Sequence, residues 1–263
     1  MPHSFEQVLA ILDDAFHELE SRIVKPAFVR RGNFHVFRYE TKSIKAAVIQ
    51  KLARRQSGLH ASLVLLRAGF VQEMGVIFRT LDEFDEDMDF LCIAIRNGIM
   101  TDLHKKYLAS FYQEEFDKPD NPFLSEQKRP TISRQKIQAA ITREDEKPLN
   151  PSDSLRLYRM RGQANSGYVH GASIHILEMY GGDPQRYHLC GMCGTPRIEE
   201  MIAAYWDYMH RGIDVTALVA ASLGEVQLAL RLDALRECFR KASGKAECED
   251  IDKLLRNFKE GTR

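Results

Sequence analysis

The chain has 263 residues, which is enough for one large domain with a substantial hydrophobic core. Its 37 lysine and arginine residues balance its 37 aspartate and glutamate residues, which excludes an overall electrostatic attraction to nucleic acid or to an anionic membrane. No apolar segment approaches the roughly 18 residues that a membrane-spanning helix needs, and the acidic N-terminus does not have the form of a signal peptide, so we expect a cytoplasmic protein.

The N-terminal region combines a helix with an extended segment. Apolar residues at steps of three and four over residues 5–23 predict an amphipathic helix, which Pro26 ends. A turn at residues 31–33 follows, and the aromatic residues over 34–39 indicate a short strand or a packed loop.

The most regular apolar pattern covers Leu59–Ile95, and we expect the other helices to pack around it. Steps of three and four place its apolar residues on one stripe of an α-helix. These residues are Leu59, Leu63, Leu66, Phe70, Met74, Ile77, Leu81, Phe84, Met88, Leu91 and Ile95. A shorter helix precedes this one. Thr41 or Ser43 caps the shorter helix, which ends near Arg55 because a Ser-Gly pair follows.

Shorter elements come after the central helix. Thr101 is the expected cap of the next helix, and the proline-containing polar segment 118–130 predicts a mobile loop. Helices over 132–143 and 152–163 follow, and a weaker, glycine-containing helix covers 166–180.

One long helix dominates the C-terminal third of the chain. Residues 187–193 form a short extended or hairpin excursion, bounded by glycines. Thr195 then caps a helix that runs to about Lys241, and either Gly212 or Gly224 can bend it.

These elements, together with a last short helix over 251–258, predict an all-α fold. We expect a multi-helix antiparallel bundle with the short excursion near 187–193, in a single domain of residues 1–263.

Charged residues are segregated along the chain. Basic residues cluster between Arg22 and Arg55, and acidic residues cluster between Asp82 and Asp89. Charge runs of this kind are usually solvated helix faces, which is how we interpret both clusters, with a functional role for either as the alternative.

One polar motif points to chemistry. Ser166 and His170 are four residues apart, so a helix places them on one face. A hydroxyl beside an imidazole can supply a nucleophile or orienting group together with a general base near neutral pH. Two such residues can also satisfy each other in a core, so a structural role stays open.

Two short motifs carry a family resemblance. The first is Leu65–Glu73, which reads LLRAGFVQE, and the second is Ser166–Gly171, which reads SGYVHG. Together they resemble a bacterial helical family of unknown function that is similar to the HEPN-like superfamily. The resemblance covers about residues 57–180, within a family core of about 41–241.

The resemblance implies a bundle in which Arg67, Glu73 and His170 approach one another around a polar pocket. Tyr168 belongs to the same pocket. Because Arg67 and Glu73 flank the apolar stripe, we expect both to be partly buried, and buried charges need partners. An internal salt-bridge network that fixes helix register is the structural alternative.

Many HEPN domains are metal-independent ribonucleases, and the resemblance implies this activity here. In that chemistry His170 acts as acid or base on the 2′-hydroxyl, and Arg161 or Arg159 stabilises phosphate charge. The sequence departs from the shorter arginine-to-histidine spacing of the family, because Arg161 precedes His170 by nine positions. On a helix this spacing turns Arg161 half a turn away from His170, although a turn at Gly162 or Gly167 can restore their proximity.

Metal binding is a weaker alternative. His188, Cys190 and Cys193 are residue types that bind zinc, but no second close pair accompanies them. We predict no metal and no cofactor. The five cysteines are odd in number and scattered, which is typical of reduced thiols.

The leading hypothesis is an HEPN-like ribonuclease of a bacterial defence or toxin–antitoxin system. Its expected partners are RNA or a nucleotide and, in a homodimer, a second copy of the chain, with no membrane partner. The alternatives are a non-catalytic interaction or scaffold domain and a nucleotide or small-ligand sensor that uses the same pocket.

Overall fold

The fold is that of a computed structural model, which describes residues 5–144, 156, 158, 160 and 162–242. The all-α prediction is confirmed: helices form the body of the molecule, and two small two-stranded sheets accompany them in this part of the chain. Among the helices of these residues, none is both long and apolar enough to cross a membrane. The helix predicted over 251–258 lies outside the described residues, as does much of the one over 152–163.

The predicted central helix is in fact two antiparallel helices, α2 (Ile44–Ala68) and α3 (Val71–Asn97). The chain reverses at Gly69, whose φ of 78° lies in the left-handed region that glycine favours. The Gly69 amide caps α2 by donating to the carbonyls of Leu65 and Leu66. The apolar steps continue across this break because each helix turns its own apolar face toward the same core.

The break predicted near Arg55 is also wrong, since α2 continues through it. Gly58 lies against α3, and a Cβ at this position would lie 2.7 Å from Leu81 Cδ2. The glycine therefore allows the two helices to approach closely and does not end α2. Ser43 caps α2 as expected, because its hydroxyl accepts a hydrogen bond from the Ala46 amide.

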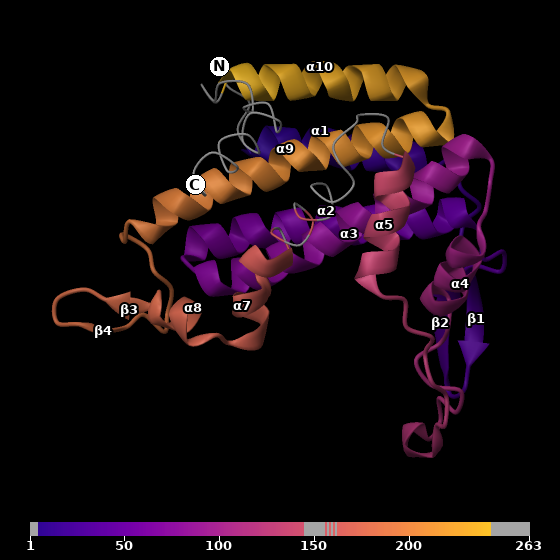
Figure 1. Ribbon diagram of the computed structural model, residues 1–263, viewed down its shortest axis with the longest axis horizontal. Coiled ribbons are helices and arrows are strands. Elements are labelled where there is room, and N and C mark those ends of the chain that lie inside the picture. The colour runs from indigo at the N-terminus through magenta and orange to yellow at the C-terminus, as the bar shows by residue number, and fades with distance from the viewer. Residues whose placement is uncertain (1–4, 145–155, 157, 159, 161, 243–263) are drawn as a thin grey trace, which may run out of the picture.

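The long C-terminal helix is divided at one of the two glycines expected to bend it. α9 (Arg197–Leu223) ends at Gly224, whose φ is 89°, and α10 (Val226–Ala242) returns along it. α1 (Phe5–Glu20) packs on α2 and α9. In Figure 1, α9 lies between α10 above and the pair of α2 and α3 below.

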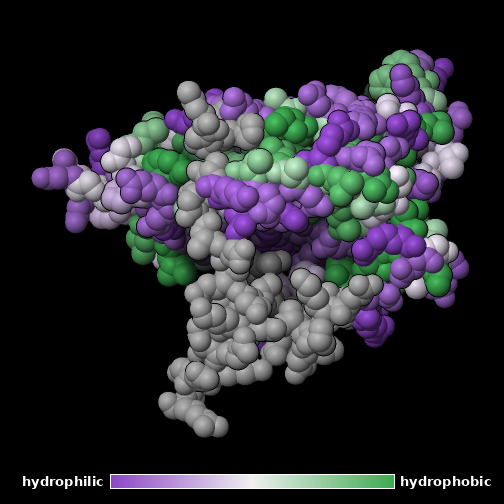
Figure 2. All heavy atoms as spheres, turned by 90° about the horizontal axis from the view of Figure 1, so that it is seen from above, coloured by the Kyte–Doolittle hydropathy of each residue, from purple (hydrophilic) through white to green (hydrophobic). Residues whose placement is uncertain are grey.

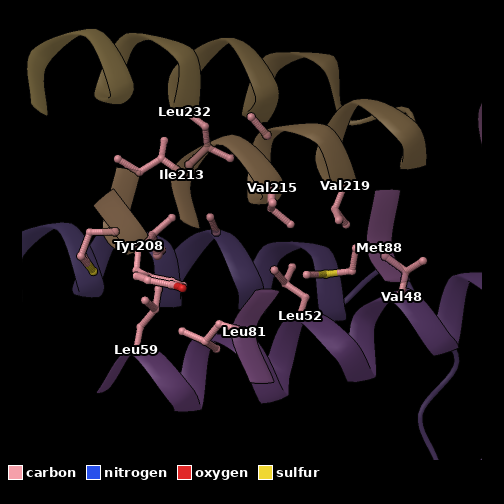
Figure 3. Close-up of a cluster of buried hydrophobic side chains, with 14 of the residues drawn as sticks. Val48, Leu52, Leu59, Leu81, Met88, Tyr208, Ile213, Val215, Val219 and Leu232 are labelled. Atoms are coloured by element: carbon pink, nitrogen blue, oxygen red, sulfur yellow. The ribbon is translucent and has the colours of Figure 1, made fainter. Parts of the chain in front are cut away.

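The hydrophobic core fills the space between α2, α3, α9 and α10 (Figure 3). The labelled side chains are Val48, Leu52, Leu59, Leu81, Met88, Tyr208, Ile213, Val215, Val219 and Leu232. Burying each aliphatic side chain stabilises the fold by about 1.5–3 kcal/mol relative to leaving it in water. On the face shown in Figure 2, hydrophilic residues predominate and hydrophobic residues form small separate patches, as amphipathic helices require.

A β-hairpin projects from one end of the molecule (Figure 1). Its strands are β1 (Ala27–Arg31) and β2 (Phe34–Arg38), so the aromatic segment after the predicted turn is a strand. Gly32 adopts a φ of 56° in that turn. α4 (Asp102–Phe111) lies beside the hairpin, and the single-turn 3₁₀-helix η1 (Pro122–Leu124) follows it.

α4 and α5 begin close to where the sequence predicts. Thr101 caps α4 through a capping box with His104. α5 (Arg134–Glu144) then packs on α3 and returns the chain to the bundle.

The other end of the molecule carries four short elements (Figure 1): α7 (Ser166–His170), α8 (Ser173–Leu177), β3 (Tyr180–Gly181) and β4 (Arg186–Tyr187). The helix predicted over 166–180 is thus two short helices, because Gly171 interrupts it with a φ of 61°. The small hairpin of β3 and β4 begins before the excursion predicted over 187–193 and overlaps it by one residue.

Candidate functional site

Ser166 and His170 lie at the two ends of α7. Ser166 is half-buried, whereas His170 is exposed and its side chain makes no hydrogen bond or ion pair within the described residues. Arg161 and Arg159, the predicted phosphate-stabilising residues, lie outside the described residues. An exposed imidazole is open to a ligand, and the chemical roles of Ser166 and His170 stay predictions.

Arg67 and Glu73 lie at the corner between α2 and α3, and neither is buried as predicted. The Arg67 side chain is 61% exposed and pairs with Glu6 of α1, and Glu73 is exposed in the first turn of α3. The prediction failed because the apolar stripe is interrupted at Gly69, so the residues that flank it there turn toward solvent. Arg67 therefore has its ion-pair partner on α1 and not on α7.

Tyr168 is turned toward the bundle and joins α7 to its neighbours. Its hydroxyl donates to Glu178 Oε2 (2.8 Å) and accepts from Arg197 Nη2 (3.0 Å). Its ring lies on Gly75 of α3, where a Cβ would come within 2.4 Å of the ring carbons. Burial first, and then the hydrogen bond with Glu178, raises the pKa of Tyr168. These contacts anchor α7, so Tyr168 has a structural role.

A network of buried charges, which the sequence analysis did not anticipate, joins α2, α3 and α9. Arg55 is 1% exposed, forms an ion pair with Asp85 and donates to the Tyr208 carbonyl (Nη2 to O, 3.3 Å). Arg211 pairs with Asp82 (Nη2 to Oδ1, 2.8 Å). The guanidinium of Arg211 also lies 4.1 Å from the centre of the Tyr208 ring, and the Tyr208 hydroxyl donates to Asp82 (3.0 Å).

The remaining buried acids of α3 bind α5 and α2. Arg134 of α5 pairs with Glu86 (Nη2 to Oε2, 2.6 Å) and with Asp87. Lys51 of α2 also pairs with Asp87 (Nζ to Oδ2, 2.7 Å). Burial raises the pKa of Glu86, and Arg134 opposes this rise. The solvated-face interpretation is therefore wrong for four residues of the acidic run, Asp82, Asp85, Glu86 and Asp87, and for Arg55 of the basic run, all of which are buried.

The sequence does contain a signal for this network. Arg55 lies three residues after Leu52 and four before Leu59, which places it on the buried face of α2. Asp85 lies three residues before Met88 on the buried face of α3. A charged residue at an apolar helix position needs a charged partner. Because these charges are paired with one another inside the protein, we interpret the network as fixing helix register.

A cleft of about 860 Å³ lies between the β1–β2 hairpin, the start of α2 and the segment after α4. Aromatic side chains of Phe37, Tyr39, Phe111 and Tyr112 form part of its walls. Basic side chains outnumber acidic ones by five to three: Arg30, Arg31, Arg38, Lys42 and Arg129 against Glu20, Glu114 and Glu115.

Several of the charges in the cleft are paired. Glu114 accepts hydrogen bonds from Arg38 (Nε to Oε1, 2.6 Å) and Arg31 (Nη2 to Oε1, 3.1 Å). These bonds, with that of Arg38 the stronger, lower the pKa of Glu114 to about 2. Arg129 pairs with Glu115 (2.8 Å). Because one carboxylate serves two guanidinium groups, positive charge remains for an anionic ligand.

One face of the hairpin, the hairpin face, consists of Phe28, Arg30, His35 and Phe37. Phe28 is the cross-strand partner of Phe37, and Arg30 is that of His35, so the four side chains share one side of the sheet. Phe28 and Phe37 are 62% and 64% exposed, and their ring centroids are 4.9 Å apart. The rings of Phe28 and His35 stack at 5.4 Å. Arg30 and Phe37 also line the cleft, as do Val29, Arg31 and Arg38 of the opposite face, so the cleft and the hairpin face have Arg30 and Phe37 in common.

His188, Cys190 and Cys193 lie between β4 and α9. Both cysteines are exposed, and Cys193 Sγ donates to the Arg67 carbonyl at 3.6 Å. Within the described part of the chain, no group of three or more histidine, cysteine, aspartate or glutamate side chains could hold a metal ion.

Comparisons of the chain with protein-family models, curated proteins and solved structures find no significant match. Its function is therefore inferred from its residues and their geometry, and the HEPN-like resemblance stays a hypothesis.

Proposed function

We propose that this protein is a non-catalytic interaction module that binds RNA or a nucleotide in the cleft between the β1–β2 hairpin and the helical bundle. The observation that carries the proposal is the excess of basic over acidic side chains in a cleft of about 860 Å³. A chain without net charge needs a local basic patch to hold such a ligand, and this cleft provides one.

Arg30 and Lys42 are the groups that we assign to phosphate. Arg30 uses Nε to donate to the Gly32 carbonyl (3.1 Å), which leaves its two terminal nitrogens as donors for a ligand. Arginine and lysine bind phosphate through charge-assisted hydrogen bonds. Arg31 and Arg38 donate hydrogen bonds to Glu114, and their charges add to the positive potential of the cleft.

The size and the walls of the cleft also suit this class of ligand. Pockets for small ligands and cofactors typically measure about 300–1,000 Å³, and this volume falls within that range. The rings of Tyr39, Phe111 and Tyr112 offer apolar surface on which a base can stack.

The test is the salt dependence of binding of a labelled RNA oligonucleotide and a labelled nucleotide, measured by fluorescence anisotropy. We expect Arg30→Ala and Lys42→Ala each to weaken binding and to reduce the salt slope by about 1. Arg231→Ala is the matched control, because Arg231 is 64% exposed but lies on α10, and it should leave the Kd unchanged. Absence of binding, or binding that neither cleft variant weakens, would contradict the proposal.

A second candidate function is RNA cleavage at His170 in a bacterial defence or toxin–antitoxin system, as the HEPN-like resemblance implies. The observation that favours it is the exposure of His170, which has no partner within the described residues. α7 and the β1–β2 hairpin lie at different ends of the molecule (Figure 1), so variants in the two regions test separate sites.

The assay for this candidate is RNA cleavage by the wild type and by His170→Ala, in the presence of a chelator. We expect cleavage by the wild type and its loss in His170→Ala, with circular dichroism confirming that both are folded. His60→Ala is the control, because His60 is an exposed histidine on α2 that pairs with Asp13. Cleavage that survives in folded His170→Ala would refute this role.

A further inference from the structure

The hairpin face leaves two phenylalanine rings in water. Phe28 and Phe37 are 62% and 64% exposed although they contact each other across the strands. A cross-strand aromatic pair stabilises a hairpin, which accounts for the contact between the two rings. It does not account for the ring surfaces that stay exposed, and these can bind a ligand.

Aromatic and basic groups occupy adjacent positions on this face. Arg30 follows Phe28 by two residues on β1 and lies opposite His35 on β2. Nucleobases stack on phenylalanine and histidine rings, and guanidinium groups bind the phosphates between them. The hairpin face therefore offers both kinds of contact that a nucleic acid chain needs.

We infer that the ligand of this protein is a single-stranded nucleic acid, whose bases stack on Phe28, His35 and Phe37 while its phosphates bind in the cleft. This inference rests on the proposed binding function and narrows its ligand.

The accessibility of its bases favours a single strand over a duplex as the ligand. In a duplex the bases stack on one another, whereas a single strand exposes base faces to aromatic side chains. Binding a duplex through its backbone also relies on many phosphate contacts, whereas the basic side chains of this cleft outnumber the acidic ones only by five to three.

The arrangement of the residues selects a chain over a mononucleotide. Arg30 and Phe37 line the cleft, while Phe28 and His35 lie on the same hairpin face beyond it. A ligand that contacts both parts must extend from the cleft onto the hairpin, as successive nucleotides of one strand do.

The experiment measures anisotropy with the full chain and four labelled ligands: a single strand of RNA, the DNA strand of the same sequence, and the duplex of each. A mononucleotide serves as competitor. Phe28→Ala and Phe37→Ala should each weaken single-strand binding on the order of tenfold. Phe37→Tyr keeps a ring and should bind more tightly than Phe37→Ala. Phe34→Ala is the matched control, because Phe34 is 54% exposed on the opposite face of the same hairpin.

Tighter binding of either single strand than of its duplex, together with weaker binding by Phe28→Ala and Phe37→Ala but not by Phe34→Ala, supports the inference. Equal binding of strands and duplexes, or wild-type affinity of both alanine variants, overturns it. In that case, salt-dependent binding that Arg30→Ala weakens would show that the proposed function still holds. If no ligand binds, the proposed function and this inference both fail, and the hairpin face is then assigned to a protein partner.

Thermal unfolding of each variant checks folding, and Phe37→Tyr provides the comparison if an alanine variant unfolds.

Discussion

Replacing Arg55 by methionine tests whether the buried charge network holds the bundle together. Arg55 is 1% exposed and contacts Asp85 twice, through Nε and through Nη2 (3.3 Å to Oδ2), and it also contacts the Tyr208 carbonyl. The methionine of Arg55→Met fills part of the same volume but leaves Asp85 without this partner. Removing one member of a buried ion pair typically costs about 3–5 kcal/mol.

The structure places the expected loss at the lower end of that range. In Arg55→Met, Asp85 still has Arg211 as a charged partner, because Arg211 Nη1 lies 3.8 Å from Asp85 Oδ2. At an effective dielectric constant of about 20, that attraction is on the order of 4 kcal/mol before desolvation, so it compensates part of the loss. We therefore expect Arg55→Met to lower the free energy of unfolding by about 3 kcal/mol, a large share of the roughly 5–15 kcal/mol of a typical domain.

Urea unfolding, monitored by circular dichroism, measures the free energy of unfolding of Arg55→Met, of Asp85→Leu and of the double variant that carries both changes. Together with the wild type, these variants form a double-mutant cycle. Because the double variant leaves neither charge unpaired, it should be less destabilised than the sum of the two single variants by about 2 kcal/mol. Arg231→Met is the control: Arg231 pairs with Glu18 at 2.6 Å on the surface, and its loss should cost less than about 1 kcal/mol. A loss below about 1 kcal/mol in Arg55→Met, or additive losses in the cycle, would refute this reasoning.

Three further predictions concern a turn, a carboxylate and a thiol. Gly69→Ala should lower the free energy of unfolding by about 1–3 kcal/mol, because a φ of 78° strains alanine and its Cβ would lie 2.6 Å from the Met192 amide nitrogen. An unchanged thermal midpoint would contradict this. Glu114, whose pKa is lowered to about 2 chiefly by its hydrogen bond with Arg38, should stabilise the fold fully above pH 4.5 and lose this effect as the pH falls toward 2. Glu114→Gln should flatten the pH dependence of the unfolding midpoint over this window, and a curve parallel to that of the wild type would count against the assigned pair. Burial raises the pKa of Cys92 to about 12, so mass spectrometry should find it unalkylated in the native protein at about pH 8 and alkylated after denaturation; labelling as fast as that of the exposed cysteines would show that it is accessible.

Local signals predicted the helical class and several helix starts. The three- and four-residue steps of apolar side chains gave the helical periodicity of α1, α3 and α9, and Ser43 and Thr101 cap helices where their side chains indicated. Such signals are readable from sequence because residues within one turn of a helix determine its face and its first hydrogen bonds.

The ends of helices were harder to predict than their apolar faces. Gly58, within α2, and Gly69, at its C-terminal boundary, illustrate this. Gly58 was expected to separate two helices, yet α2 continues through it because the missing side chain makes room for Leu81. Gly69 was placed inside a helix, yet it ends α2 in a left-handed conformation. Both are single glycines in a helical pattern, and only the packing around each distinguishes close approach from chain reversal.

Helix periodicity is a property of consecutive residues, so the sequence alone indicates which helix positions lie on an apolar face. Arg55 and Asp85 occupy such positions, although the charge runs that contain them were interpreted as solvated faces. The pairing of these two residues, which are 30 positions apart, and that of Asp82 with Arg211, which are 129 positions apart, come from the tertiary structure. The cleft likewise depends on Arg38 and Glu114, 76 positions apart. Contacts of this kind depend on how whole helices and strands pack together, and no pattern of neighbouring residues specifies that packing.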